Sequence, residues 1–422
     1  LETGLKHNMK ALEIYKKFKS NFWIAKKLNN MGLLYAEIGN FEMALKCLEE
    51  ALILSERDPL LTIESYIDSI INVALKKGDT ELVQKYFQRL ENMYNQAPTS
   101  YIEYLYKYNK AKMLKNSSRI RDKAKAEKLF KQVIETKTER IHIDVIILSC
   151  LHLCDLLLSE YRISNNSDVL DEINQNIAQI IAFAEKTHSY PTFCEIFILL
   201  AKLALLNFNV KAARRYLTQA QKIAESYELK KLAMIISHEH DNLLKELDKW
   251  KILSESNASL AERIELARLD DQMTAMLKKR TYEVPKISNE DPVMILILTE
   301  GGNLLYSKKF MEDFSFEDDI LGGFLTTLNY IVSEVFSEGL DRAVFGKYTL
   351  LMLPLQPFLV CYIFKGASYY AYHKIKNFLD SIQDDNLIWQ SLQNFLQKSK
   401  SVQLNDIPSL ESKIMEIFEE KK

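Results

Sequence analysis

The sequence has few of the residues that interrupt helices or cross-link chains. Only 11 glycines and 8 prolines occur among 422 residues, and the five cysteines are scattered. So few cysteines over this length do not make a disulfide framework, so reduced thiols in the cytoplasm are the default expectation. No secretory signal is present, and the most apolar helical stretches, 146–159 and 196–208, are too short to span a bilayer.

The chain also has no large excess of positive or negative charge. Fifty-five basic residues stand against 57 acidic ones, which gives a formal net charge of -2 and no sign of a nucleic-acid partner. The basic runs at 119–125 and 211–215 are interleaved with acidic and small residues, so a solvated outer helix face explains them better than a nucleic-acid patch. With 47% hydrophobic and 27% charged residues, the chain is globular and long enough for two or three domains.

Large and small side chains alternate around a glycine turn near the N-terminus. They are Leu28, Met31, Gly32, Tyr35, Gly39, Phe41, Ala44, Leu48 and Ala51. Two antiparallel helices need small residues where their backbones approach and large ones in the gaps between. The pattern resembles the tetratricopeptide repeat, a helical pair, except that Leu28 and Met31 hold places usually taken by Trp and Leu.

Weaker units follow at a spacing near 40 residues. Their patterned residues lie within 63–75 and 83–90, 101–114 and 126–133, 145–161 and 169–184, and 197–204 and 213–220, and each pair of stretches marks two helices. The resemblance implies that residues 1–280 stack as an α-solenoid with a concave groove. Residues 9–17 match the second helix of a repeat, so the chain is expected to be a piece of a longer protein.

The end of the solenoid is expected to be a capping segment. Residues 228–255 should carry a more polar outer face. Ser259 and Glu262 form a capping box, and the helix that they start should dock on the solenoid or link it to the next domain.

The periodicity changes after an expected linker at 281–292. Residues 293–298 are a six-residue apolar run typical of a strand buried on both faces, and 300–303 allow 304–310 to return as a hairpin. The remaining expected elements are a helix from 318 or 319 to 335, strands at 341–345, 348–353 and 358–364, and a helix at 368–382.

This β-β-α-β-β-β-α order over 293–400 resembles the longin domain, a relative of the roadblock domain. The amino-acid sequences of 297–302, 339–343 and 358–366 are similar to those of Asgard archaeal proteins that join tetratricopeptide repeats to such a module. The resemblance implies a mostly α protein, a repeat solenoid followed by a small α+β adaptor domain. Its implied partners are a small GTPase or a second longin-like chain, including a homodimer, in the cytoplasm and peripheral to a membrane through partners.

A last amphipathic helix is expected within 401–422. Asp406 should cap it, and its apolar stripe is Ile407, Leu410, Ile414 and Ile417. The stripe either packs on its own domain or folds back over a binding surface as an autoinhibitory helix.

Few side-chain clusters could carry chemistry. Cys150 and Cys154 share a helix face from which His152 points away, so buried structural thiols explain them better than zinc. His238 and His240 are two residues apart, which is the wrong spacing for ligands on one helix, so a solvated face is expected. The glycine pairs at 301–302 and 322–323 lack the other residues of a phosphate-binding loop, and no nucleophile motif occurs. We therefore expect no enzyme, no cofactor and no metal.

The resemblance also implies a set of groove positions. They are Lys26, Asn29, Asn30, Leu33 and Glu37 in the best repeat and Asn72 in the next. Asn30 matches the asparagine that holds a peptide backbone or terminal carboxylate in some family members. The next repeat has Asp68, Ser69 and Asn72 where a clamp for a carboxylate would need Lys or Arg, so an acidic C-terminal peptide is not the first expectation.

Three interpretations of the function are open. The leading one is a non-enzymatic scaffold whose repeat groove binds a protein or peptide and whose longin-like module binds a second partner. The alternative is the sensory part of a signalling or transcriptional regulator whose effector domain lies upstream of Leu1. The third, an enzyme with a ligand pocket on the sheet, is supported by the glycine pairs alone.

Overall fold

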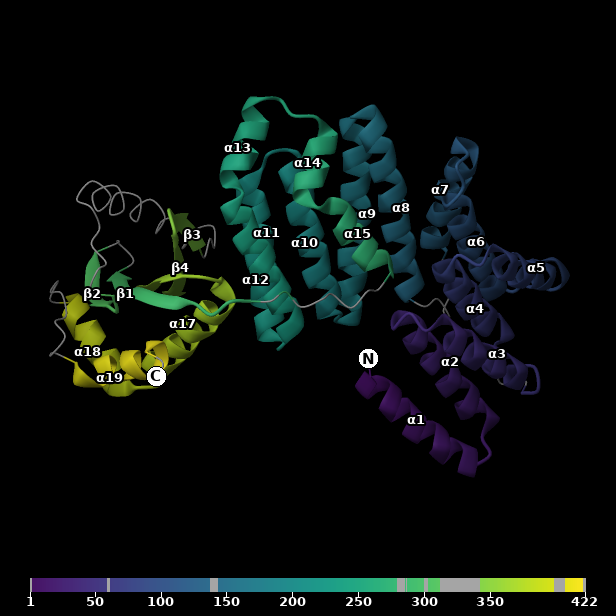
Figure 1. Cartoon of the computed structure of the whole chain (residues 1–422), viewed down its shortest axis with the longest axis horizontal. Coiled ribbons are helices and arrows are strands. Elements are labelled where there is room, and N and C mark those ends of the chain that lie inside the picture. Colours follow the sequence, from purple (N-terminus) through teal and green to yellow (C-terminus); the bar gives the residue numbers. More distant parts are fainter. Residues whose placement is uncertain are drawn as a thin grey trace. The chain divides into compact units, whose positions relative to one another are not determined.

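The computed structural model (Figure 1) describes residues 2–58, 61–136, 143–278, 285, 287–299, 303–311, 342–397 and 407–419. The chain divides into two compact units, of which the first comprises 1–187 with 273–281 and the second 188–272 with 282–422. Both units contain helices, and the second also contains a five-stranded sheet.

The first unit is an array in which each helix packs against the next one along the chain. Its helices are α1 (Glu2–Lys17), α2 (Asn21–Glu37), α3 (Phe41–Ser55), α4 (Ile63–Lys77), α5 (Thr80–Gln96), α6 (Ser100–Lys115), α7 (Ile120–Glu135), α8 (Ile143–Ser164) and α9 (Ser167–Thr187). The first helices of successive pairs also touch, α2 with α4, α4 with α6 and α6 with α8. This is the contact pattern of stacked repeats, so the predicted helical pairs of this unit are confirmed.

Close packing inside the first repeat depends on Gly32. A Cβ built on Gly32 would lie 2.6 Å from Cγ of Leu48 and 2.9 Å from the carbonyl oxygen of Ala44. Ala44 and Leu48 are fully buried in α3, so α2 and α3 approach more closely there than a larger residue allows. Asn40 then caps α3, because its side chain accepts a hydrogen bond of 3.1 Å from the amide three residues on.

The second unit continues the helical pairs. Its helices before the sheet are α10 (Tyr190–Leu206), α11 (Val210–Ser226), α12 (Lys230–Lys245), α13 (Leu247–Glu255), α14 (Leu260–Ala267) and α15 (Leu269–Lys278), within which the division between the units falls. The predicted capping box is confirmed, with Glu262 N donating to Ser259 Oγ at 3.3 Å and Ser259 N donating to Glu262 Oε2 at 2.8 Å. The predicted docking of this helix on the solenoid is confirmed as well, because α14 packs against α10.

The sheet has the order β2-β1-β5-β4-β3, and all neighbouring strands are antiparallel. Its strands are β1 (Asp291–Thr299), β2 (Leu304–Lys309), β3 (Arg342–Phe345), β4 (Tyr348–Leu355) and β5 (Phe358–Lys365). Each predicted strand therefore exists within two residues of its expected bounds. The predicted hairpin closes through a hydrogen bond of 2.9 Å from Thr299 N to Asn303 O.

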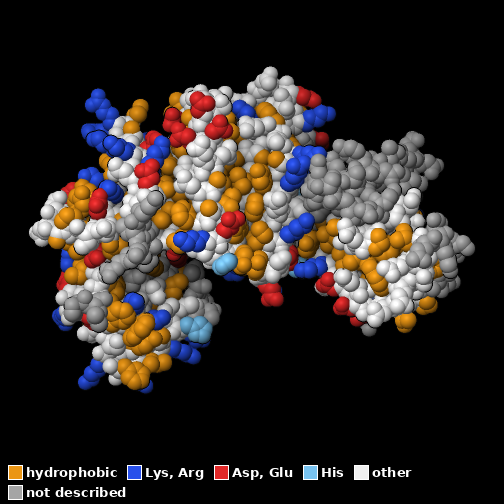
Figure 2. All heavy atoms as spheres, turned by 180° about the vertical axis from the view of Figure 1, so that it is seen from behind, with side chains coloured by type: hydrophobic (Ala, Val, Ile, Leu, Met, Phe, Trp, Pro, Cys, Tyr) orange, Lys and Arg blue, Asp and Glu red, His pale blue; other side chains and the backbone are white. Residues whose placement is uncertain are grey.

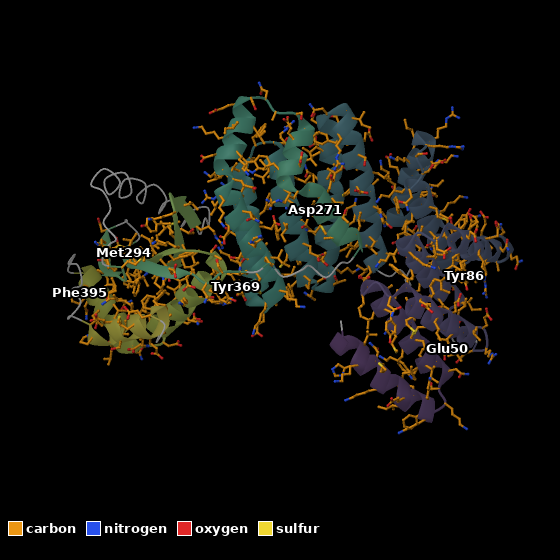
Figure 3. All side chains as sticks on the ribbon, viewed as in Figure 1. Glu50, Tyr86, Asp271, Met294, Tyr369 and Phe395 are labelled. Carbon is orange, nitrogen blue, oxygen red and sulfur yellow. The ribbon has the colours of Figure 1, made fainter. Side chains whose placement is uncertain are left out.

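Both faces of the sheet are buried. On one face, α17 (Ser368–Gln383), α18 (Asn386–Gln397) and α19 (Pro408–Phe418) pack on Ile295, Ile297, Val360 and Tyr362, among others. The other face presents Val293, Leu296, Leu359, Cys361 and Met294, which Figure 3 labels. The continuous apolar run of β1 is thus explained. The helix predicted at 318–335 lies outside the described residues.

The last helix finds its partner within the sheet domain. Ile407, Leu410 and Ile414 are buried against α17 and the sheet, and Ile417 is partly buried there. The structure therefore favours domain packing over an autoinhibitory role for this stripe. Helix α19 begins at Pro408 with Ile407 in the N-cap position, whereas the expected cap, Asp406, lies outside the described residues.

The expectation of a polar outer face at 228–255 is wrong for α12. This helix packs against α17 and β3, and Asp241, Arg342 and Ser368 are buried where they meet. The Ser368 amide and hydroxyl donate to the Asp241 carboxylate, the amide at 3.0 Å. Arg342 Nη1 donates to Ser368 Oγ at 3.0 Å and lies 3.6 Å from Asp241 Oδ1. A polar run on one helix cannot reveal a partner 127 residues later in the chain.

Substituting Gly32 should weaken the first repeat. Gly32→Ala adds a Cβ that contacts Leu48 and Ala44, and overpacking of this kind costs about 1–3 kcal/mol, against a gain of about 1 kcal/mol in helix propensity. We expect a net loss in the free energy of unfolding, measured by urea denaturation with circular dichroism. Lys46→Ala, an exposed change on α3, is the control; equal stability of the two variants would contradict the close approach of α2 and α3.

Removing the Asp241 carboxylate should destabilise the second unit. Arg342 is fully buried, and breaking a buried ion pair by removing one partner costs about 3–5 kcal/mol. Asp241→Ala should therefore lower the melting temperature in differential scanning calorimetry, whereas Asp248→Ala on the exposed side of α13 should leave it unchanged. Equal melting of both variants would show that the network adds nothing to stability.

Candidate partner-binding face

Helices α2, α4, α6 and α8, the first helices of successive pairs, form one row, the first-helix face. The predicted positions on α2 lie at the N-terminal end of this row. Lys26 is exposed, with Nζ 4.3 Å from the centroid of the Phe22 ring. Asn30 is exposed, and 37% of Leu33 is accessible. Asn29 is half-buried, and its Oδ1 has no hydrogen-bond partner in the described part of the chain. These four side chains can meet a partner without breaking a bond that they already make to another repeat.

Glu37 and Asn72, the other predicted positions, are bonded to neighbouring repeats instead. The Glu37 carboxylate on α2 pairs with the Lys76 ammonium on α4. Asn72 on α4 donates to Asp68 Oδ2 at 3.1 Å and accepts a hydrogen bond from the Lys112 ammonium on α6. Their side chains therefore hold the stack together, and a partner would have to compete with these bonds.

The most buried polar cluster of the first-helix face joins α4 to α6. Asn109 donates to Asp68 Oδ1 at 2.8 Å and to the Leu105 carbonyl at 2.9 Å, and it is fully buried. The Lys112 ammonium lies 3.7 Å from Asp68 Oδ1 and 4.1 Å from the centroid of the Tyr108 ring. Desolvation lowers the pKa of Lys112 to about 8, against the opposing pull of Asp68. Burial likewise raises the pKa of the Tyr108 hydroxyl.

A third set of bonds joins α6 to α8. Lys115 Nζ lies 2.6 Å from Asp155 Oδ2 and 3.0 Å from His152 Nδ1. The His152 ring stacks on Phe130 with 5.2 Å between centroids. Desolvation, together with the positive charge of Lys115, holds the pKa of His152 well below its usual range, so this imidazole is neutral.

These bonds share one spacing. Glu37 and Lys76 are 39 residues apart, Asn72 and Lys112 are 40 apart, and Lys115 and His152 are 37 apart. Each bond therefore joins nearly equivalent positions of adjacent repeats. The three lysines were missed because each repeat was read alone, although polar groups of opposite character one repeat period apart were a usable signal.

Two predictions about polar helix faces need correction. A solvated face is correct for His238 but wrong for His240, which is buried beside Asp241. Arg214 is not part of a solvated run either, because it is half-buried and donates to the Arg342 carbonyl. Both errors have one cause: α11 and α12 face the sheet domain.

The other basic run is solvated as predicted. Arg119, Arg121, Lys123 and Lys125 are exposed at the start of α7. Figure 2 shows basic and acidic side chains intermingled over the face that it displays, where no continuous field of one charge is visible.

The cysteines are placed as structural thiols. Cys150 and Cys154 are fully buried, and burial raises the pKa of Cys150 to about 12 and also raises that of Cys154. Neither thiol therefore forms the reactive thiolate at neutral pH. Among the described residues, no group of three or more His, Cys, Asp and Glu is placed to hold a metal ion. In the same residues, no helix combines the length and the apolarity that a membrane span requires.

Comparison with known proteins agrees with this geometry at the first repeat. Residues 25–58, which hold most of α2 and all of α3, match the tetratricopeptide repeat family. No curated protein matches the chain. A tetratricopeptide repeat within a long array of helices is consistent with a protein that binds other proteins.

Lys112 should make stability depend on pH in a defined direction. Because its pKa falls from 10.5 to about 8 on folding, the unfolded chain binds more protons between those values, so the contribution of Lys112 to stability rises with pH there. We expect Lys112→Met to be less stable than the parent at pH 7, because it leaves the largely buried Asp68 carboxylate without its cation and Asn72 without a donor.

The measurement is urea denaturation of parent and variant between pH 7 and 10. The free energy of unfolding of the parent should gain on that of Lys112→Met as the pH rises. Lys110→Met, the lysine two residues earlier, is the matched control and should show no such trend. A constant difference between the parent and Lys112→Met would mean that Lys112 is not desolvated.

Proposed function

We propose that this chain is a non-enzymatic scaffold whose first-helix face binds a protein or peptide at α2. The observation that carries the proposal is the coincidence of the matched repeat with the accessible side chains of Lys26, Asn29, Asn30 and Leu33. A cation, two amides and an apolar residue on one side of a helix suit a peptide with main-chain polar groups and an apolar anchor. Glu37 and Asn72 would border this surface.

We further propose that the sheet domain is a longin- or roadblock-like module that binds a second chain. Its strand order and the sequence of its described elements support this assignment. Strand β3 packs against α12, whereas β2 is the edge at the opposite end of the described sheet, so a second chain would pair there. A small GTPase or a second copy of this chain, which would give a homodimer, is the proposed partner. In an archaeal cell this partner would keep the scaffold at the periphery of a membrane.

The test of the scaffold role compares two charge-changing double variants. Lys26→Glu with Leu33→Asp alters the accessible side of α2, whereas Lys46→Glu with Ile53→Asp makes the same chemical changes on exposed positions of α3. Partners captured by the parent chain from its native source are identified, purified and titrated by calorimetry. We expect the α2 variant to lose about tenfold or more in affinity, or about 1.4 kcal/mol, and the α3 variant to bind normally.

Equal affinity of the two variants would refute binding at α2. A DNA-binding or nucleotide-binding domain encoded upstream of Leu1 would favour the alternative, the sensory part of a signalling or transcriptional regulator. Circular dichroism of both variants shows whether a loss of binding reflects loss of fold.

A further inference from the structure

In the second unit, a segment of the chain itself lies on the side of α10 that corresponds to the predicted binding side of α2. The repeat residues of α2 and α3 recur in α10 and α11 with a constant offset of 169, since Gly32 corresponds to Ala201, Ala44 to Ala213 and Leu48 to Leu217 (201 − 32 = 213 − 44 = 217 − 48). The same offset carries the predicted positions onto α10. Lys26, Asn29, Leu33 and Glu37 correspond to Glu195, Ile198, Lys202 and Leu206.

The α14 segment contacts these corresponding positions. Lys202 Nζ donates to the carbonyl of Ala267 at 2.9 Å, and Arg263 Nη1 donates to the carbonyl of Leu206 at 2.5 Å. Just beyond α14, Gln272 donates to the carbonyl of Glu195 at 3.3 Å. Helix α14 therefore covers the surface of α10 that corresponds to the proposed partner-binding surface of α2.

The segment is an amphipathic helix with a defined pattern. Leu260, Ile264 and Ala267 are buried at i, i+4 and i+7, whereas Ala261 and Glu265 are exposed. Lys202 binds the carbonyl end of α14 and also pairs with Glu239 at 2.8 Å, so one ammonium meets both the negative end of a helix dipole and a carboxylate.

The fit between α14 and its surface is incomplete. A cavity of about 30 Å³ remains between α10, α12 and α14, lined by Ile198, Lys202, Glu239, Trp250 and Ala267, among others. It has room for about two water molecules. An eight-residue helix has little stability of its own, so its place depends on this contact surface and on its caps.

We propose that α14 is a built-in occupant of this surface and that a partner's amphipathic helix with the same i, i+4, i+7 apolar pattern can replace it. The inference rests on the proposed scaffold function and names the class of partner. While α14 is in place, its high effective concentration excludes such a helix, and binding is confined to the first unit. When α14 leaves, Lys202 and the apolar side of α10 receive the C-terminal turn and the apolar residues of the incoming helix.

The test uses the full chain and a fluorescein-labelled peptide of residues 259–272, acetylated and amidated, with fluorescence anisotropy as the readout. In Ile264→Asp, a charge placed at a buried position should release α14 from the surface. The apparent affinity for the peptide rises with the fraction of chains whose surface is open. We expect the variant to bind about tenfold or more tightly than the parent.

Matched variants separate the contact from general effects. Ala261→Asp adds the same charge to the exposed side of α14 and should bind the peptide as weakly as the parent. Lys202→Met added to Ile264→Asp should reverse most of the gain, because the incoming helix then loses the ammonium at its carbonyl end. Equal peptide affinity in all four proteins would overturn the proposal.

Hydrogen exchange of the parent chain keeps the proposal testable if Ile264→Asp fails to fold. Amides of residues 264–267 should exchange faster than those of 199–206 in α10, because α14 opens on its own. Equal protection would make α14 a fixed part of the core and would overturn the proposal. Failure of the scaffold function is seen separately, because the Lys26→Glu, Leu33→Asp variant alters partner binding at α2 and leaves the peptide experiment unaffected.

Discussion

A helical hairpin of this length cannot bury its own apolar side, so the stability of the chain depends on what joins one repeat to the next. The apolar part of that junction is ordinary close packing. Its polar part is unusual in its regularity, because Glu37, Asn72 and Lys115 each bond to a residue about one repeat period further on. These bonds line the same side of the array that is proposed to bind partners. The side chains that specify the stack and those left for recognition are therefore different members of one row.

The helices and strands of this chain were largely predictable, because local signals determine them. The pattern around Gly32 predicts the first helical pair, and the apolar run of β1 with its hairpin predicts the start of the sheet. The limits of the strands were also close, each within two residues, and the predicted capping box of Ser259 and Glu262 marks the start of α14. The sequence signals that determine each helix or strand thus lie within a few residues of it.

Contacts between distant segments were not predictable in the same way. His240 and Arg214 have the spacing of surface residues, which predicts a solvated position for both, but α11 and α12 face the sheet domain, so His240 is buried and Arg214 donates to the Arg342 carbonyl. The candidate site was likewise predictable only in part. Lys26, Asn30 and Leu33 are accessible as expected, but nothing within the first repeat shows that Glu37 is paired with Lys76. Only a comparison of successive repeats could have found that pair.

The polar cluster of Asp241, Arg342 and Ser368 brings together three segments that are made at different times during synthesis. Ser368 lies 127 residues after Asp241, so on the ribosome α12 is complete long before its partners emerge. Until then the Asp241 carboxylate stays hydrated, and the apolar residues around it lack their cover. Because domains generally fold as units and in order from the N-terminus, closing this junction is a late step in the biogenesis of the chain. The apolar residues around Asp241 therefore stay exposed to water while the next 127 residues are made, and exposed apolar surface of this kind is what chaperones cover in folding intermediates.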